Sequence, residues 1–260
     1  MITTEIGYTT TDRISVRGCD LAADLIGKID FIDMMLLVIL GRPCQGNERE
    51  MLNAILVTVT DHGLTPSAIA ARLTYTGAPD ALQGAVAAGL LGAGSKLLGA
   101  MQNAYDMLGE ITRDLPEDAS PEALHAAALA LVTRRRQARQ PLAGLGHNIH
   151  VNGDPRIPAL RAVSQRNGYL GRHWQALQAV EDIVSEQRGK LLPINTAGAV
   201  GAMVADMGLP GQLARGLSLV GRCAGLVAHL VEEEAKPTGL EIWELVLAQD
   251  ERNVLPGKTR

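Results

Sequence analysis

The loop Gly144-Leu145-Gly146-His147-Asn148-Ile149-His150-Val151-Asn152-Gly153-Asp154-Pro155-Arg156 has the highest density in the chain of residue types that can do chemistry. The imidazole of His147 can transfer protons near neutral pH, and the guanidinium of Arg156 is suited to binding a carboxylate. Glycines allow positive φ angles and a close approach of ligand to backbone, and Pro155 disfavours helix at Asp154. The pattern predicts a shaped site loop. A long helix–helix connection with a capping Asp and a surface arginine would have the same composition.

Two further segments combine polar and turn-forming residues, Asp61-His62-Gly63-Leu64-Thr65-Pro66-Ser67 and Leu192-Pro193-Ile194-Asn195-Thr196-Ala197-Gly198. Each precedes a stretch that is typical of a helix. Thr65 or Ser67 can cap the first helix, with Pro66 in its first turn. His62 has two interpretations, a site residue or a partly buried structural histidine.

Composition limits the partners and the compartment. The net charge of −4, from 24 basic and 28 acidic residues, argues against nucleic acid as the main partner. The basic run Arg134-Arg135-Arg136 with Arg139 is interpreted as a solvated helix end or, alternatively, as phosphate contacts for a nucleotide-like ligand. We find no signal peptide and no apolar run of roughly 20 residues, so we expect a cytoplasmic protein without membrane contact. The three cysteines lack metal-ligand spacing, so no metal site is predicted.

The elements that position these segments are expected to be helices. Hydrophobic residues make up 47% of the chain and aromatic residues only 3%, so the core must consist of Ala, Leu, Val and Met. A short hairpin is predicted within residues 2–18, and residues 31–40 are apolar on nearly every side, which predicts a buried helix. The Ala- and Gly-rich stretch 80–98 predicts a closely packed helix pair, within or between subunits. Further helices are predicted over residues 48–60, 66–74, 121–139, 156–169, 173–188, 196–208 and 213–234, with a short one around Trp243.

The order of these segments resembles that of the citrate synthase superfamily. The matching segments are Asp61 to Ser67 with Ala71-Arg72 (D-H-x-x-x-x-S…A-A-R), Gly144 to His147 with Asp154-Pro155-Arg156 (G-x-G-H…D-P-R), Asn195 to Gly198 with Gly208-Leu209-Pro210 (N-V-D-G and the next helix), and Arg222 to His229 (R-x-x-G-x-x-A-H). The resemblance covers about residues 10–240. Within the superfamily the chain is most similar to the stand-alone citryl-CoA lyases, the counterparts of the C-terminal module of ATP-citrate lyase.

The resemblance implies an all-α fold with two lobes and an active site between them. The large lobe is expected to comprise residues 1–103 and 207–260, and the small lobe residues 104–206. It also implies a homodimer or higher homo-oligomer. The implied ligands are a polycarboxylate and a CoA thioester, the latter a substrate and not a permanently bound cofactor.

The resemblance also assigns roles to individual residues. It implies that His147 lies near the keto or hydroxyl oxygen of a C4 acid and that Arg156 and Arg222 bind its carboxylates in the same pocket. His62 is expected to line the site. Further substrate contacts are expected from His150, Arg72 and Asn195. The CoA adenine is expected against the start of the loop: Leu142, Ala143, Gly144, Leu145 and Gly146.

Two positions depart from the family pattern. Leu98 stands where the synthases have the histidine of an L-H-G-G segment, and Ala197 stands where the family has the Asp of N-V-D-G. Alanine cannot move a proton. Cleavage of citryl-CoA or a related 3-hydroxy-3-carboxyacyl-CoA tolerates these losses better than synthesis does, because synthesis must deprotonate a thioester methyl. The leading hypothesis is therefore a carbon–carbon lyase; the alternatives are a non-catalytic polycarboxylate- or CoA-binding homologue and a related decarboxylase or retro-aldolase.

Overall fold

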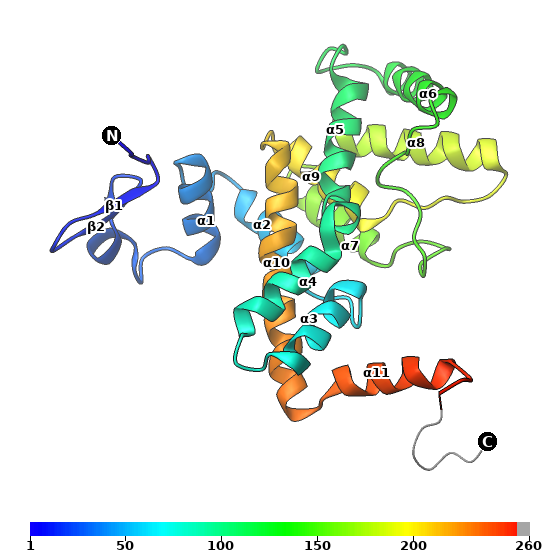
Figure 1. The fold of residues 1–260 in the computed structure, drawn as a ribbon. Helices are drawn as coiled ribbons and strands as arrows, with labels where there is room; N and C mark the ends of the chain where they lie inside the picture. The colour runs from blue at the N-terminus through cyan, green and yellow to red at the C-terminus, as the bar shows by residue number, and fades with distance from the viewer. Residues whose placement is uncertain (254–260) are drawn as a thin grey trace.

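The computed structural model describes residues 1–253. It is 64% helical with a small sheet, which confirms the predicted all-α class (Figure 1). The helices are α1 (Phe31–Leu40), α2 (Glu48–Thr60), α3 (Pro66–Gly77), α4 (Leu82–Leu97), α5 (Ala100–Thr112), α6 (Pro121–Gln137), α7 (Arg156–Arg166), α8 (Arg172–Arg188), α9 (Thr196–Asp206), α10 (Gly211–Ala235) and α11 (Thr238–Gln249).

The N-terminal segment forms a three-stranded antiparallel sheet in the order β1-β2-β3. The predicted hairpin is β1 (Gly7–Thr9) and β2 (Ile14–Val16), in which Gly7 pairs with Val16. A third strand, β3 (Cys19–Asp20), was not predicted. The sheet and α1 extend from one side of the molecule (Figure 1).

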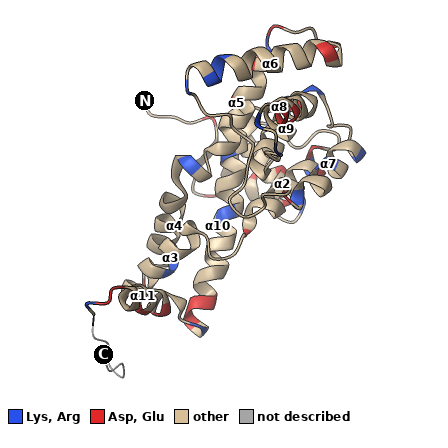
Figure 2. Ribbon diagram, turned by 90° about the vertical axis from the view of Figure 1, so that its right-hand side faces the viewer, with Lys and Arg blue, Asp and Glu red and all other residues tan. Residues whose placement is uncertain are grey.

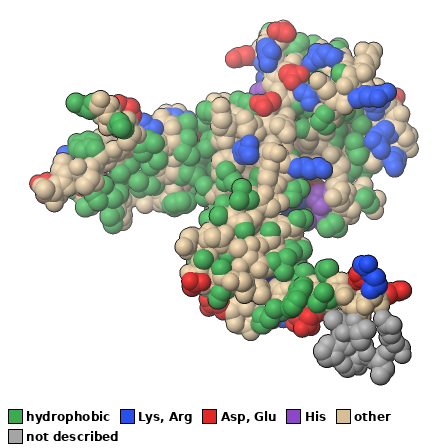
Figure 3. Space-filling view, in the orientation of Figure 1, with side chains coloured by type: hydrophobic (Ala, Val, Ile, Leu, Met, Phe, Trp, Pro, Cys, Tyr) green, Lys and Arg blue, Asp and Glu red, His purple; other side chains and the backbone are tan. Residues whose placement is uncertain are grey.

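The prediction that residues 31–40 form a buried helix is correct for the helix and wrong for its burial. Asp30 caps α1 through its side chain, and Gly41 ends it with a φ of 74°. Met35, Leu36 and Leu37 are buried, but Phe31 is 68% exposed and Ile39 is 47% exposed. The helix lies at the edge of the chain's own core, so only one face is covered. Apolar side chains of this N-terminal part are visible on the surface in Figure 3.

The main core is a cluster of buried side chains from α1, α2, α5, α6, α7, α8, α9 and α10, and a smaller cluster lies between α3, α4 and α10. The 25-residue helix α10 runs through the middle of the molecule (Figure 1). α5 and α9 approach closely at Gly201, where a Cβ atom would lie 2.7 Å from the backbone nitrogen of Tyr105. The division into lobes stays a prediction; its boundary at residues 103/104 falls inside α5.

The small residues of α4 allow close packing within the chain. A Cβ atom on Gly89 would lie 2.8 Å from Leu226 of α10 and 3.0 Å from Ala71 of α3. The helical run is broken at Gly94, which has φ 53° and ψ −162°. The stretch Leu82–Thr112 is long and apolar enough to cross a membrane, contrary to the sequence prediction. One such stretch is weak evidence, because core helices share this length and composition.

Figure 2 shows basic positions at the end of α6, and the side chains of Arg134, Arg135 and Arg136 make hydrogen bonds within the chain. Arg134 and Arg135 both pair with Glu110 of α5, and Arg135 also donates to the carbonyl oxygen of Pro141 at 3.0 Å. Cations at a helix C-terminus are favourable in themselves. These contacts favour the helix-end interpretation of the run over phosphate binding.

Candidate active site

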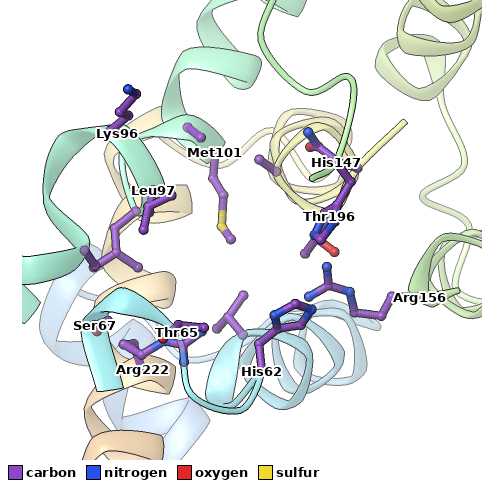
Figure 4. Close-up of a pocket in the computed structure, with 16 residues that line it drawn as sticks. His62, Thr65, Ser67, Lys96, Leu97, Met101, His147, Arg156, Thr196 and Arg222 are labelled. Carbon is purple, nitrogen blue, oxygen red and sulfur yellow. The ribbon is translucent and has the colours of Figure 1, made fainter. Parts of the chain in front are cut away.

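Segments far apart in sequence enclose one pocket of about 310 Å³ (Figure 4). They are the end of α2, the turn before α3, the α4–α5 junction, the loop after α6, the start of α9 and the middle of α10. In Figure 3 a histidine patch marks a hollow between the upper and lower parts of the molecule. The lining residues are Val59, His62, Thr65, Ser67, Ala93, Lys96, Leu97, Leu98, Ala100, Met101, His147, Arg156, Asn195, Thr196, Ala197 and Arg222.

The loop that carries His147 is held by pairing with the segment before α9. Leu145 and Ile194 form an antiparallel bridge. The backbone nitrogen of Gly146 donates to the carbonyl of Pro193 at 2.7 Å, and the side chain of Asn195 donates to the carbonyl of Gly146 at 2.7 Å. Gly146 has a φ of 76°, a conformation that favours glycine. This pairing fixes His147 against the start of α9.

The hydrogen bonds of His147 determine its tautomer. Its Nδ1 accepts the backbone N–H groups of Ile149 at 3.1 Å and His150 at 3.0 Å. Burial, reinforced by His150, lowers the pKa of the His147 imidazole, so the ring is neutral at neutral pH. A neutral ring whose Nδ1 accepts must carry its proton on Nε2. His147 is therefore a hydrogen-bond donor with no free ring nitrogen to act as a base.

Asp154 ties Arg156 to the first residue of α9. Asp154 is only 2% exposed. Its carboxylate accepts hydrogen bonds from Nε and Nη2 of Arg156, at 2.9 and 2.8 Å, and from the hydroxyl of Thr196 at 2.9 Å. Burial alone would raise the pKa of the Asp154 carboxyl, but the hydrogen bonds from Arg156 and Thr196 hold it well below its usual range. The guanidinium is thereby oriented, and within residues 1–253 its Nη1 has no hydrogen-bond partner.

Arg222 brings a second guanidinium to the same pocket. Its Nη1 is buried and has no hydrogen-bond partner among the described residues. Desolvation lowers the pKa of Arg222; nearby Asp61 acts in the opposite direction, and Arg156 lowers the pKa further. A buried, unpaired donor on a cation costs free energy unless a ligand satisfies it. The unpaired Nη1 of Arg222 therefore indicates that the pocket binds an anionic ligand.

His62 sits on a turn that is anchored from α10. The carboxylate of Asp61 accepts the backbone N–H of Gly63 at 2.9 Å and lies 2.9 Å from Nε2 of His229. Nε2 of His62 lies 3.4 Å from Nε2 of His150, within hydrogen-bond distance. Burial first, and then the charge of Arg156, lower the pKa of the His62 imidazole.

His62, His147 and His150 could in principle hold a metal ion, since one nitrogen atom from each ring lies within 4.8 Å of the others. Two observations favour an anion instead. Nδ1 of His147 is already an acceptor for two backbone N–H groups, so a metal at Nε2 would require a proton at Nδ1 and break both hydrogen bonds. The charges of Arg156 and Arg222 also act on His62 and oppose a cation there.

Part of the pocket wall is apolar. Leu98 and Met101 are 7% and 8% exposed, and Ala197 is at the second position of α9. Neither Leu98 nor Ala197 can donate or accept a proton. No Asp or Glu side chain of the part of the chain that the structure describes lines the pocket.

The structure brings most of the predicted site residues together. His62, His147, Arg156, Asn195, Ala197 and Arg222 all line the pocket, as the predicted convergence of the two arginines requires. His150 does not line it and instead contacts His62 and His147. The five residues from Leu142 to Gly146 do not line it either, and contact with an adenine there stays a prediction.

Arg72, which was expected to contact the substrate, does not line the pocket. Its side chain is 1% exposed and pairs with Glu232 and Glu233 of α10. Its Nε donates to Nδ1 of His229 at 3.1 Å. An arginine in an apolar helix can satisfy buried carboxylates as well as a substrate, and the sequence spacing does not separate the two.

Thr65, Lys96 and Met101 also line the pocket, and none of them was predicted to do so. Thr65 was expected only as a helix cap, and its side chain does accept from the backbone of Ala68. Met101 lies in an apolar stretch whose helical period cannot separate core from pocket wall. The break at Gly94, which turns Lys96 and Leu97 to the pocket, leaves no signal beyond the glycine itself.

The model of the citrate synthase C-terminal domain family matches residues 4–242. The chain belongs to the citrate synthase family. Citrate synthase 2 from Bacillus subtilis is 28% identical over 191 residues, which are 72% of this chain and 47% of that protein. The chain thus spans less than half the length of the curated relatives that it matches.

Solved structures of this family share the fold. Citryl-CoA lyase from Hydrogenobacter thermophilus has a TM-score of 0.81 and 28% identity, over 100% of this chain and 96% of that chain. An Asp-to-Ala mutant of ATP citrate lyase from Methanosaeta concilii, in complex with (3S)-citryl-CoA, has a TM-score of 0.77 and 21% identity, over 99% and 42% of the two chains. The second likeness, at 21% identity, shows the fold alone.

Proposed function

We propose that the protein is a carbon–carbon lyase that cleaves citryl-CoA, or a related 3-hydroxy-3-carboxyacyl-CoA, to an acyl-CoA and a keto acid such as oxaloacetate. One observation carries the proposal. Two guanidiniums and a donating imidazole converge on a pocket that, within residues 1–253, has no carboxylate on its wall. The likeness in length and fold to a stand-alone citryl-CoA lyase supports it.

The basic side of the pocket suits the polycarboxylate end of the substrate. The unpaired Nη1 of Arg222 and the open Nη1 of Arg156 offer donors for separate carboxylates. Hydrogen bonds between ionised partners are stronger than neutral ones. Nε2 of His147 then donates to the tertiary hydroxyl oxygen, which becomes the keto oxygen.

Cleavage needs a base for the hydroxyl proton, and His62 is the group left to accept it. The lowered pKa of His62 keeps its imidazole neutral, and His150 can take up the displaced proton through the shared Nε2 contact at 3.4 Å. Loss of the O–H proton forms the keto group as the C2–C3 bond breaks. The electron pair of the C2–C3 bond forms the thioester enolate, which then gains one proton to give the acyl-CoA.

The apolar wall favours cleavage over synthesis. An enolate is a strong base and takes its proton from water or from protonated His62. Synthesis must remove a proton from an unactivated thioester, and a positioned base is worth roughly 10²–10⁴-fold for such a step. Leu98 and Ala197 supply no base there.

The same wall supports a second candidate, a homologue that binds a polycarboxylate or a CoA ester without turnover. Decarboxylation or retro-aldol cleavage of a related acid would also dispense with a carboxylate base. We further propose a cytoplasmic homo-oligomer in which the CoA thioester is a substrate and no cofactor stays bound.

Incubation with citryl-CoA tests the lyase. Mass spectrometry should find acetyl-CoA and oxaloacetate released in equal amounts. His147→Ala should lower the rate roughly 10²–10³-fold, as expected for loss of one donor to a developing charge. The matched control is His125→Ala, an exposed histidine on α6. Tight binding of citryl-CoA without release of either product would support the binding homologue and refute the lyase.

A further inference from the structure

We infer that His229, which does not line the pocket, is a positioning residue for the base of the reaction. It holds Asp61, and Asp61 holds the turn that carries His62. The inference rests on the proposed function for the role of His62 as the base. Where His62 is held depends on the fold alone, so this part can be tested without turnover.

Arg72 determines which ring nitrogen of His229 carries the proton. Nε and Nη2 of Arg72 lie 3.1 and 2.8 Å from Nδ1 of His229. A guanidinium can only donate hydrogen bonds, so Nδ1 must be the acceptor and the proton must be on Nε2. His229 therefore donates its Nε2–H to the carboxylate of Asp61, at 2.9 Å.

The guanidinium of Arg72 is itself held by partners in α10 and α11. Its side chain is 1% exposed, and Nη1 donates to the carboxylate of Glu233 in α10 at 2.6 Å. The other carboxylate oxygen of Glu233 accepts the backbone N–H of Gly239 in α11, also at 2.6 Å. Turning a buried guanidinium away from such partners costs free energy, because it leaves charges unpaired. The donors that face His229 are therefore fixed.

Asp61 uses its second carboxylate oxygen to close the turn around His62. Oδ1 lies against His229, and Oδ2 accepts the backbone N–H of Gly63 at 2.9 Å, so the two neighbours of His62 in the chain are tied together. Gly63 has a φ of 73°, a conformation that favours glycine. From this turn the ring of His62 extends into the pocket toward Arg156 (Figure 4).

The contact between His229 and Asp61 serves orientation and not burial. The side chain of Asp61 is 51% exposed, so water can satisfy its carboxylate. The ion pairs of Arg72 with α10 are complete without Asp61. If His229 only tied α3 to α10, the removal of its ring nitrogens would leave His62 unaffected. If it positions the turn, His62 must respond.

The test is an NMR titration of His62, whose signal is identified among the six histidines by its absence in His62→Gln. Burial is the main reason that the pKa of His62 lies below 6.5. His229→Leu removes the donor to Asp61 and loosens the turn, so the pKa of His62 should rise toward 6.5. His229→Gln should keep the wild-type value, because its amide offers an acceptor for Arg72 and a donor for Asp61.

Two further variants separate positioning from a general loss of structure. Tyr75→Phe removes another hydrogen bond between α3 and α10, from Tyr75 to Glu234, and should leave the pKa of His62 unchanged. Asp61→Asn replaces an acceptor oxygen on a half-exposed side chain with a donor and decides the question if His229→Leu does not fold. It should also raise the pKa of His62, and the lost negative charge cannot cause such a rise, because by itself it lowers the pKa.

Turnover of citryl-CoA separates the inference from the proposed function. His229→Leu should lower kcat roughly 10²-fold, since a misplacement of about 1 Å can cost that much. KM should change little, because Arg156 and its partner Asp154 are untouched. An unchanged pKa of His62 in both disrupting variants, or an equal rise in His229→Gln, overturns the inference and leaves the lyase standing. If the wild-type protein cleaves no thioester, the lyase fails and the titration alone decides whether His229 positions His62.

Discussion

At the scale of single residues, hydrogen bonds to the backbone decide what His147 can do. Because its Nδ1 accepts two N–H groups, Nε2 must donate. Another hydrogen-bond donor can substitute for a donating imidazole. It could not substitute for an imidazole that acts as a base. The same reasoning separates Arg72, whose partners are carboxylates of the chain, from Arg222, whose Nη1 has no partner among the described residues.

His147→Gln should therefore keep more activity than His147→Ala. The glutamine amide can donate to the substrate oxygen, whereas alanine removes a donor that is worth roughly 10²–10³-fold in rate. Steady-state release of oxaloacetate from citryl-CoA measures both variants. Equal loss in the two would mean that His147 acts as a base, contrary to its tautomer.

Arg156→Lys should weaken citrate binding about 10-fold or more, although the charge is kept. Lysine lacks the planar fork that pairs with Asp154 through Nε and Nη2 while leaving Nη1 for a ligand. Calorimetry with citrate measures the change, and Arg134→Lys, with a 63% exposed side chain, is the matched control. An unchanged affinity in Arg156→Lys would place the carboxylates elsewhere.

The pKa values of His62 and His147 predict a loss of stability in mild acid. Both are lowered from the ordinary value of 6.5, so the unfolded chain binds protons there more readily than the folded one. The free energy of unfolding should therefore be highest above pH 6.5 and fall as the pH drops below it. Urea unfolding at pH 7.5 and 5.5 measures this, and His62→Gln should reduce the difference. A protein that is more stable at pH 5.5 would contradict the assignment.

At the scale of elements, the site depends on the close approach of the His147 loop to α9. A Cβ atom on Gly198 would lie 2.5 Å from the carbonyl oxygen of Gly144. Gly198→Ala should destabilise the protein by about 1–3 kcal/mol, the usual cost of overpacking. Gly216→Ala in α10, where a Cβ atom meets nothing within 4 Å, should be neutral or stabilise by about 0.5–1 kcal/mol. Urea unfolding compares them, and equal effects would contradict the tight contact.

Local signals were sufficient for many elements. The ends of α1 and α2 were predicted at the residues where they occur, because Asp30 and Gly41 are strong cap residues and the apolar period is clear. Thr65 caps α3, whereas Ser67 donates to the carbonyl of Gly89 in α4. That contact crosses between helices, and no local pattern encodes it.

The sequence was sufficient to predict most of the polar residues of the candidate site, but not how they are arranged in space. The motif order predicted that His147, Arg156, Asn195 and Arg222 meet in one pocket, but it gave no tautomer, and it included Arg72, which lies outside the pocket. Of the apolar residues that line the pocket, only Leu98 and Ala197 were singled out from the sequence. The other apolar lining residues belong to α2, α4 and α5, and these helices meet only through tertiary packing.

At the scale of the whole molecule, exposed apolar side chains predict self-association. Leu91 of α4, Val231 of α10 and Trp243 of α11 are 80%, 62% and 57% exposed. Large contiguous apolar surface is uncommon on monomers. Sedimentation at micromolar concentration should find a dimer or higher oligomer, and a monomer there would refute the proposed assembly.

The most direct test of the account is the turnover of Ala197→Asp on citryl-CoA. If the chain is a lyase whose pocket wall lacks a carboxylate, Asp at the start of α9 adds a carboxyl group that can return a proton to the enolate. We expect an increase in kcat on the order of 10²-fold over the wild-type protein, with little change in affinity. A fall in citryl-CoA turnover would contradict it, because a decarboxylase or retro-aldolase adapted to an uncharged wall loses activity when a carboxylate is placed there.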